Sequence, residues 1–188
     1  KRMATLRGFP ARFKTTKPED CVGDGWLAHF VAARALLKNG GIAVFTGDCG
    51  TGKTRMSYEL AKLHKERTEY VYGLNKICPA TYTTADKMLE ALRASFSNDN
   101  DAKSERNVSE ELSAASLLVI DELDNSVKSE FGQRKLKRII DERYMANLPT
   151  IIITNHDKNK LGELLPKPVI SRIRENGKGF FFDWESFR

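Results

Sequence analysis

The stretch IAVFTGDCGTGKT, residues 42–54, decides the fold. Residues 42–46 are apolar or β-branched and predict a short buried strand. Residues 47–54 match the pattern G-x-x-x-x-G-K-[ST], in which a glycine-rich turn joins a strand to a helix. Glycines let the main chain wrap closely around an anion, so that N–H groups and the start of the helix face phosphate oxygens. We therefore predict a nucleotide phosphate site here.

The last two side chains of this pattern extend the interpretation from phosphate to metal. Lys53 places an ammonium beside the β- and γ-phosphates of a nucleoside triphosphate, and the Thr54 hydroxyl can ligate Mg²⁺. The alternative is a glycine-rich turn without a ligand, which the strand–loop–helix context disfavours. The residues expected to contact the nucleotide are Gly47, Asp48, Cys49, Gly50, Thr51, Gly52, Lys53 and Thr54.

An acidic pair follows a second apolar run. Residues 117–120 are LLVI, and Asp121 and Glu122 come next. A carboxylate at the end of a buried strand faces the sheet edge where ligands bind, so Asp121 suits the second Mg²⁺ contact. Glu122 suits orienting and partly deprotonating a water molecule, which favours hydrolysis over a small-molecule kinase reaction. The alternative is that both acids only solvate the strand end.

Two later polar positions are candidates for catalysis. Asn155 ends a further apolar strand, and it would face the γ-phosphate if that strand lies between the phosphate-loop strand and the acidic strand. Arg172, in the sequence SRIR at 171–174, could reach a neighbouring subunit's γ-phosphate as an arginine finger. The simpler alternatives are an asparagine that caps a turn and an arginine on a solvated helix face.

Strands and helices alternate along the chain. The segments between the strands have helical periodicity, apart from a polar stretch at 97–107, expected to be a loop, and 67–78, to which we assign no role. This alternation predicts an α/β fold with a mostly parallel sheet between two helical layers. Five strands are expected, at residues 42–46, 80–84, 116–121, 150–155 and 179–184.

Composition narrows the class of protein. The chain has 188 residues, 40% of them hydrophobic and 30% charged, which suits one packed α/β domain. Its net charge of +6 is compatible with a polyanionic partner. No apolar run approaches the roughly 20 residues needed to cross a bilayer, and no signal peptide is visible. Three scattered cysteines argue against disulfides and a zinc site, so we expect a cytoplasmic protein: Cys21, Cys49 and Cys78.

The order of these patterns resembles that of the AAA+ ATPases: phosphate loop, LLVIDE, TN, then SRIR. More narrowly, it resembles the bacterial DnaC-type helicase loaders, whose ATPase domain is similar to the transposition helper IstB. The likeness runs from about residue 8 to residue 188, and three further stretches carry it: GFPARF at 8–13, TTAD at 83–86 and FDWESFR at 182–188.

The resemblance implies a P-loop NTPase of the AAA+ type with five strands in the order 5-1-4-3-2 and no C-terminal helical lid. It implies ATP and Mg²⁺ at a subunit interface, with Arg172 acting in trans and Arg174 as the runner-up for that role. It also implies that the segment with Phe9 and Phe13 helps to hold the adenine. The oligomer would be a spiral that grips single-stranded DNA and places a replicative hexameric helicase on it.

The same resemblance places DNA contacts on two helices. Arg93 and Phe96 fall on a helix that looks like the family's initiator-specific element. Lys128 and Phe131 start the helix after the acidic strand, which in the family faces the central channel. Basic residues with aromatic platforms suit sequence-independent binding of single strands. Because both phenylalanines also fit apolar helix faces, a role in the core is the alternative.

The chain is expected to divide into a linker and one domain. Residues 1–20 would be a basic linker, the remnant of an N-terminal domain if one has been removed, and residues 21–188 the AAA+ ATPase domain. The first hypothesis for function is an ATPase that loads a replicative helicase in a bacterium, encoded by the bacterium or by a phage. The alternative is an IstB-like ATPase that regulates a transposase on duplex DNA, although residues 184–188 favour the loader.

Overall fold

The computed structural model describes residues 5–14, 23–65, 67–71, 74–94, 102–123 and 125–187. No helix within these ranges is both long and apolar enough to cross a membrane. The helices are α1 (Asp24–Lys38), α2 (Lys53–Lys62), α3 (Ala85–Ala94), α4 (Ala102–Ala114), α5 (Glu130–Met145), α6 (Lys158–Leu164) and α7 (Lys167–Asn176), with the short 3₁₀ helices η1 (Ala11–Lys14) and η3 (Asn125–Lys128). The strands are β1 (Leu6–Arg7), β2 (Ile42–Gly47), β3 (Arg67–Val71), β4 (Leu74–Cys78), β5 (Ala80–Thr84), β6 (Leu117–Asp121), β7 (Thr150–Thr154) and β8 (Gly177–Phe182).

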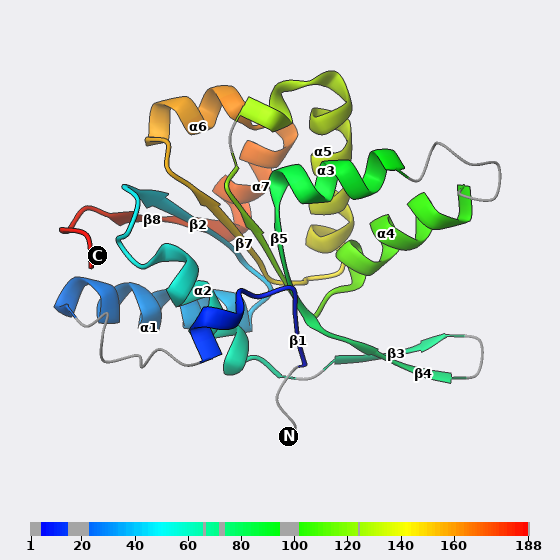
Figure 1. The fold of residues 1–188 in the computed structure, drawn as a ribbon, viewed down its shortest axis with the longest axis horizontal. Helices are drawn as coiled ribbons and strands as arrows, with labels where there is room; N and C mark the ends of the chain where they lie inside the picture. Colours follow the sequence, from blue (N-terminus) through cyan, green and yellow to red (C-terminus); the bar gives the residue numbers. More distant parts are fainter. Residues whose placement is uncertain are drawn as a thin grey trace.

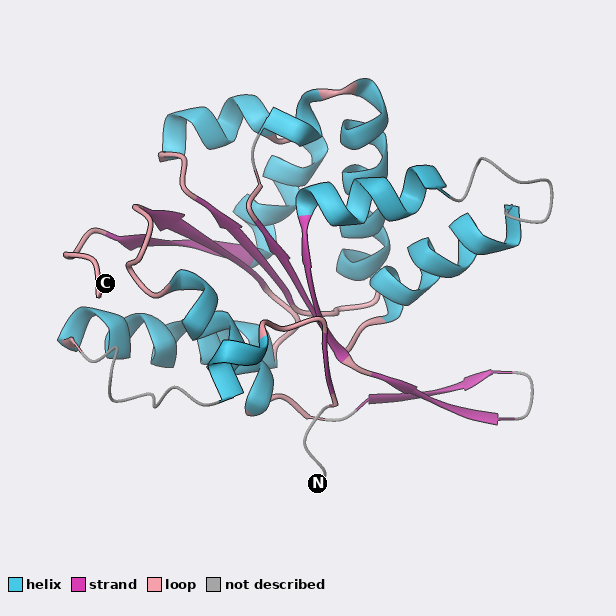
Figure 2. Cartoon of the chain, viewed as in Figure 1, coloured by secondary structure: helices cyan, strands magenta, loops and turns pink. Residues whose placement is uncertain are grey.

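One parallel sheet organises the molecule. Its six strands lie in the order β1-β5-β6-β7-β2-β8, and every neighbouring pair is parallel. Helices cover both faces, with α1 and α2 on one side and α3, α5 and α7 on the other (Figures 1 and 2). The predicted α/β fold with a parallel sheet between helical layers is confirmed.

The predicted number of strands is wrong, and so is the order 5-1-4-3-2 as a description of the whole sheet. A sixth strand, β1, pairs outside β5, with Leu6 opposite Ala80. It lies within residues 1–20, the segment expected to be a linker. A strand of two residues is too short to produce an alternating pattern, so periodicity could not reveal it. The five predicted strands by themselves follow the order β8-β2-β7-β6-β5.

Two segments between the predicted strands also have structure. β3 and β4 pair antiparallel in a separate two-stranded sheet, a hairpin that extends away from the main sheet (Figure 1). The predicted loop at 97–107 is partly wrong, because α4 begins at Ala102. Residues 102–107 are mostly good helix formers, but the apolar face that signals a helix starts only at Val108, which packs on the core.

Two hydrophobic clusters fill the spaces on either side of the sheet. Successive residues of a strand point to opposite faces, so Val44 packs with α3 and α5, whereas Phe45 packs with α1 and α2. Ile120 and Val119 divide in the same way on β6. The central strands are therefore buried on both faces, as in other parallel sheets, and their carboxyl ends meet at one edge.

Arg143, near the end of α5, is fully buried and ties two chain segments together. Burial lowers the pKa of its guanidinium to about 9. The guanidinium replaces hydration with bonds to main-chain carbonyls around the starts of β6 and β7, which suits a buried cation. Its acceptors are the carbonyls of Leu112, Ser113, Ala115 and Pro149 and the hydroxyl of Thr150.

Replacing Arg143 by methionine removes its hydrogen bonds to these buried acceptors, of which the Pro149 carbonyl still accepts from the Leu118 N–H. We predict that Arg143→Met lowers the free energy of unfolding by about 3 kcal/mol. The control is Arg138→Met on the exposed face of the same helix, which should change it by less than about 0.5 kcal/mol. Urea unfolding followed by circular dichroism measures both, and equal losses would show that Arg143 has no special structural role.

Candidate functional site

The loop between β2 and α2 depends on its glycines. Gly47, Gly50 and Gly52 have φ values of 136°, 86° and 86°, in the left-handed region that other residues rarely adopt. At Gly47 a Cβ atom would lie 2.2 Å from the carbonyl oxygen of Phe182 on β8. Glycine at these positions lets the loop close over the end of β2 and begin α2, and the pattern itself requires it at 47 and 52.

Lys53 directs its ammonium into this loop. The residue is 5% exposed, and Nζ donates to the carbonyl oxygens of Gly47 at 2.7 Å and Asp48 at 2.6 Å. Burial lowers the pKa of the ammonium, while Cys49, Asp121 and Asp48 act in the opposite direction. The ammonium therefore lies within the loop, where it can donate to the oxygen atoms of a phosphate chain.

The end of the chain holds the phosphate loop from outside. Trp184 Nε1 donates to the Thr51 carbonyl at 3.0 Å, and the Phe187 N–H donates to the Gly50 carbonyl at 3.1 Å. In a trans peptide the N–H points opposite to the C=O, so the N–H groups of Thr51 and Gly52 point away from these residues. Sequence reasoning identified residues 182–188 only as part of a family likeness and did not anticipate this contact.

Asp121 and Thr54, predicted to share a metal ion, lie together. Thr54 Oγ1 donates to Asp121 Oδ2 at 2.7 Å, although the two residues come from different segments of the sheet edge. Asp121 Oδ2 also accepts from the hydroxyl of Tyr82 at 2.9 Å, and Oδ1 accepts from the N–H of Glu122 at 2.7 Å. A hydroxyl and a carboxylate are hard oxygen ligands, so this pair fits Mg²⁺ bound to a nucleotide.

Tyr82 is a member of this group that sequence reasoning missed. Burial, the Asp121 and Glu122 carboxylates and the bond to Asp121 raise the pKa of its hydroxyl, so it remains a donor at neutral pH. Its strand was predicted, but nothing in a threonine- and tyrosine-rich stretch indicates which side chain meets a residue of the next strand.

Glu122 and Asn155 are exposed at the same edge of the sheet. Glu122 has φ of 54°, an uncommon conformation for a residue other than glycine. β7 lies between β6 and β2, which is the condition for Asn155 to approach the γ-phosphate. The preceding residue, Thr154, braces the acidic segment because its hydroxyl donates to the Leu123 carbonyl at 2.7 Å.

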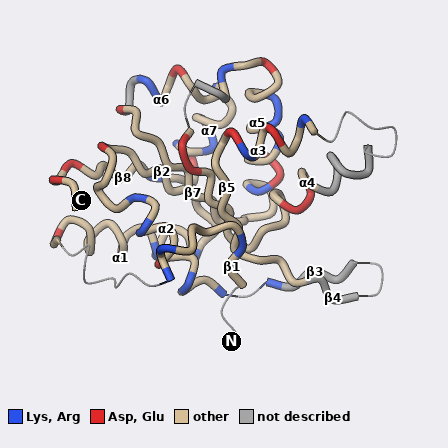
Figure 3. The backbone as a smooth tube through the Cα atoms, in the orientation of Figure 1, with Lys and Arg blue, Asp and Glu red and all other residues tan. Residues whose placement is uncertain are grey.

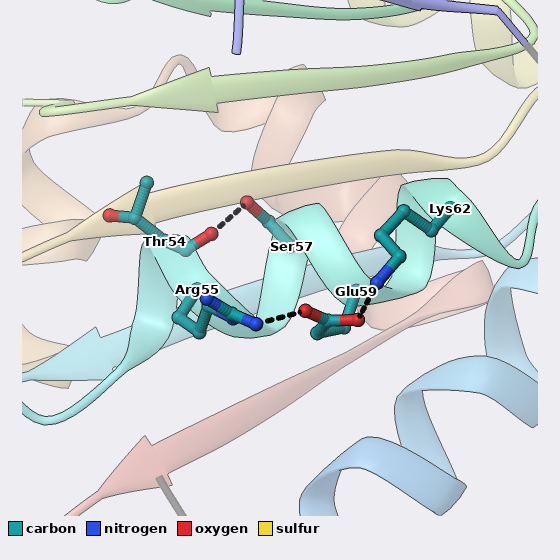
Figure 4. A network of polar contacts seen from close by, with 5 residues as sticks. All are labelled: Thr54, Arg55, Ser57, Glu59 and Lys62. Carbon is teal, nitrogen blue, oxygen red and sulfur yellow. Dashed lines mark hydrogen bonds and ion pairs between the residues drawn. The ribbon is translucent and has the colours of Figure 1, made fainter. Parts of the chain in front are cut away.

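Phe9 and Phe13 pack beside α2. The Phe9 ring centroid lies 5.6 Å from that of Tyr58 and 5.3 Å from that of Tyr82, and the Phe13 centroid lies 5.7 Å from that of Tyr58. The guanidinium of Arg55 lies over Phe13. Figure 4 shows the polar side of α2, where the buried pair Arg55 and Glu59 is extended by Lys62. The segment 8–13 is thus attached to the helix that follows the phosphate loop.

Arg172 does not join this group. Its guanidinium lies 4.5 Å from the Tyr144 ring centroid, and its Nε lies 3.6 Å from Asp141 Oδ1. α7 packs on the face of the sheet opposite α2, so Arg172 is separated by the sheet from the start of α2. Arg174, the runner-up, is exposed.

The DNA-contact candidates are partly brought together. The Arg93 guanidinium of α3 lies 5.3 Å from the Phe131 ring centroid at the start of α5, and Lys135 Nζ lies 5.4 Å from the same centroid. Lys128 is exposed at the end of η3, and Phe96 lies outside the described residues. Lys135 was missed, although its spacing of one helical turn from Phe131 is visible in the sequence.

Three comparisons relate this geometry to known proteins. A family model of the AAA domain (dynein-related subfamily) matches residues 43–162, which include the phosphate loop, the acidic pair and Asn155. The replicative helicase loader DnaC of Escherichia coli strain K12 is 29% identical over 146 residues, 77% of this chain and 55% of that protein. The crystal structure of the DnaC helicase loader is 17% identical with a TM-score of 0.65, covering 92% of this chain and 99% of that one. AMPPCP-bound DnaA from Aquifex aeolicus is 20% identical with a TM-score of 0.68, covering 88% and 49%.

The chain belongs to the AAA family, and it is a P-loop ATPase domain. Within that class it is similar to the DnaC-type helicase loaders in sequence and shares their fold. The family predicted from the sequence is therefore confirmed. The chain spans about half the length of the E. coli DnaC that it matches, with 55% of that protein covered.

Proposed function

We propose that this chain is the ATPase domain of a protein that loads a replicative ring helicase onto single-stranded DNA, in the cytoplasm of a bacterium and encoded by it or by a phage. The observation that carries the ATPase part is the bond between Thr54 and Asp121, which joins the phosphate loop to the acidic strand. The similarity to DnaC supports the loader part. The division into a linker at 1–20, which adds β1 to the sheet, and a domain at 21–188 belongs to the same proposal.

Each side chain at the sheet edge has a distinct task. Lys53 and the loop N–H groups hold the β- and γ-phosphates of ATP. Thr54 and Asp121 hold Mg²⁺, which when bound offsets the negative charge of the phosphates. Glu122 orients and partly deprotonates the attacking water, and Asn155 positions that water from the neighbouring strand.

The adenine end of the nucleotide is assigned to the segment that contacts α2. Phe9 and Phe13 are half-buried against Tyr58, four residues after Thr54 on the helix that begins at the phosphate loop. A flat base suits aromatic neighbours of this kind. We therefore retain both phenylalanines as adenine contacts.

Removing the charge of Glu122 separates binding from hydrolysis. We predict that Glu122→Gln binds ATP as the parent does but releases phosphate at least about 100-fold more slowly, because the water loses its base. Lys53→Ala should instead lose nucleotide affinity, and Glu130→Gln, at an exposed position of α5, should behave like the parent. Nucleotide titration and phosphate release measure the two steps, and a parental rate for Glu122→Gln would refute its assigned role.

Arg172 is assigned to the site of a neighbouring subunit in a spiral oligomer. It lies across the sheet from α2 in its own chain, so action in trans is the role that its position allows. Its ion pairs with Asp141 and Glu175 are 3.6 and 3.7 Å long and its side chain is 34% exposed, so these pairs oppose its release only weakly, and its contact with Tyr144 must break as well.

Mixing two inactive variants tests this assignment. We predict that Arg172→Ala spares ATP binding but lowers turnover of the assembled protein by about 10³-fold, the usual effect of an arginine finger. Mixing it with Lys53→Ala should restore part of the activity, because the second variant supplies the finger to sites of the first. Arg174→Ala is the matched control, and if it fails while Arg172→Ala does not, the runner-up is the finger.

Single-stranded DNA is assigned to the cluster at the start of α5. Arg93, Phe131 and Lys135 combine two cations with an aromatic ring, and Lys128 adds an exposed cation nearby. Farther along α5, where both kinds of charge occur (Figure 3), Lys137 pairs with Asp141 and Arg138 pairs with Glu142. The start of the helix therefore suits a nucleic-acid backbone better than its outer face does.

Turnover with different partners distinguishes the candidate functions. We predict that single-stranded DNA and a replicative helicase stimulate ATP hydrolysis by a chain that includes any upstream segment. The double variant Arg93→Ala/Lys135→Ala should bind single-stranded DNA about tenfold more weakly. The control, Arg134→Ala/Lys137→Ala on the outer face of α5, should not. Stimulation by duplex DNA alone, with filaments in ATP, would favour the IstB-like alternative.

A further inference from the structure

Tyr82 lies on β5, next to the acidic strand β6. We infer that Tyr82 is a positioning residue, whose hydroxyl holds the Asp121 carboxylate in place for Mg²⁺ and whose ring connects that carboxylate to the segment of residues 5–9. This inference rests on the proposed function, because it deepens the metal-binding role assigned to Thr54 and Asp121.

Strand register brings the hydroxyl to the carboxylate. Tyr82 is opposite Val119, so Asp121 is its diagonal neighbour two residues farther along β6. A diagonal pair on one sheet face lies about 7–8 Å apart at the main chain, a distance that a tyrosine side chain spans. The resulting bond to Oδ2 is 2.9 Å long. Tyr82 is therefore placed by the sheet itself, and a shorter side chain at this position could not reach Asp121.

The hydroxyl completes a set of donors around the carboxylate. Oδ2 accepts from Thr54 Oγ1 at 2.7 Å and from the Tyr82 hydroxyl, while Oδ1 accepts from the Glu122 N–H. The terminal torsion of an aspartate is soft, so bonds to both oxygens are needed to hold its plane. Groups that hold a metal-binding carboxylate in this way typically contribute a factor of about 10–100 in metal affinity or activity.

The second part of the inference concerns the ring of Tyr82, which connects Asp121 to the segment of residues 5–9. β1 pairs with β5, so that Arg7 lies opposite Thr81. At Gly8, with φ of 78°, a Cβ atom would lie 2.2 Å from the Tyr82 carbonyl oxygen, which shows how closely the two segments pack. The next residue, Phe9, places its ring centroid 5.3 Å from that of Tyr82. A movement of this segment must therefore shift the ring whose hydroxyl holds Asp121.

Tyr82→Phe removes the hydroxyl and keeps the ring. Tyr58→Phe is the matched control, because both rings contact Phe9 but Tyr82 is the one whose hydroxyl bonds Asp121. Calorimetric titration with ADP, first in EDTA and then over a range of Mg²⁺, separates metal from nucleotide binding without turnover. For Tyr82→Phe we expect ADP affinity in EDTA within about twofold of the parent and about a tenfold higher Mg²⁺ requirement.

The outcomes separate this inference from the proposed function. If Tyr82→Phe and Tyr58→Phe need the same Mg²⁺ as the parent, the inference is overturned and the proposed function stands. If the parent and Lys53→Ala bind ADP equally, the nucleotide site itself is misassigned. Thermal unfolding of both tyrosine variants checks that a changed Mg²⁺ requirement does not come from a damaged fold.

Phe9→Ala tests the connection through the ring. We expect this variant to raise the Mg²⁺ requirement about threefold, less than Tyr82→Phe, because the hydroxyl remains but its ring loses a neighbour. Phe9 is also assigned to the adenine, so the measure is the Mg²⁺ requirement and not the ADP affinity. An unchanged requirement would overturn the coupling to residues 5–9.

Discussion

The hydrogen bond from Thr54 to Asp121 joins the phosphate loop to the acidic strand, and it depends on the order of the central strands of the sheet. Thr54 lies in the first turn of α2 after the phosphate loop, and Asp121 ends β6, two strands away from β2 in the sheet. β7 lies between these two strands, so the two side chains meet beyond its carboxyl end. Thr154 at the end of β7 then braces the acidic segment through Leu123. The parallel order of the central strands is thus the condition for a site that can hold a metal nucleotide.

The phosphate loop is held from both sides. From within, Lys53 bonds the carbonyls of Gly47 and Asp48. From outside, Trp184 and Phe187 bond the carbonyls of Thr51 and Gly50. Because each carbonyl bonded from outside fixes the opposite N–H of the same peptide, the contacts of Trp184 and Phe187 preorganise donors that a phosphate needs, which reduces the ordering cost of binding. The last strand and the residues after it therefore belong to the nucleotide site as much as the loop does.

The correct predictions came from patterns within short continuous stretches of the sequence. The phosphate loop occupies eight consecutive residues, and the acidic pair follows a strand that is apolar because both of its faces are buried. Errors arose where the local signal is weak or absent. β1 is two residues long, and the first turns of α4 carry no apolar face. Arg172 has a recognisable position in the sequence, but its packing against Tyr144 depends on the way α5 and α7 meet.

The sequence by itself determined the chemistry: which residues can hold phosphate, which can hold a metal and which can activate water, because these groups lie in short continuous segments. Only the tertiary structure decided which residues hold those groups in place. Tyr82 reaches Asp121 across 39 positions, Arg143 reaches Leu112 across 31, and Trp184 reaches Thr51 across 133. Hydrogen bonds over such separations follow from strand order and helix packing, and they leave no periodicity in the sequence from which to predict them.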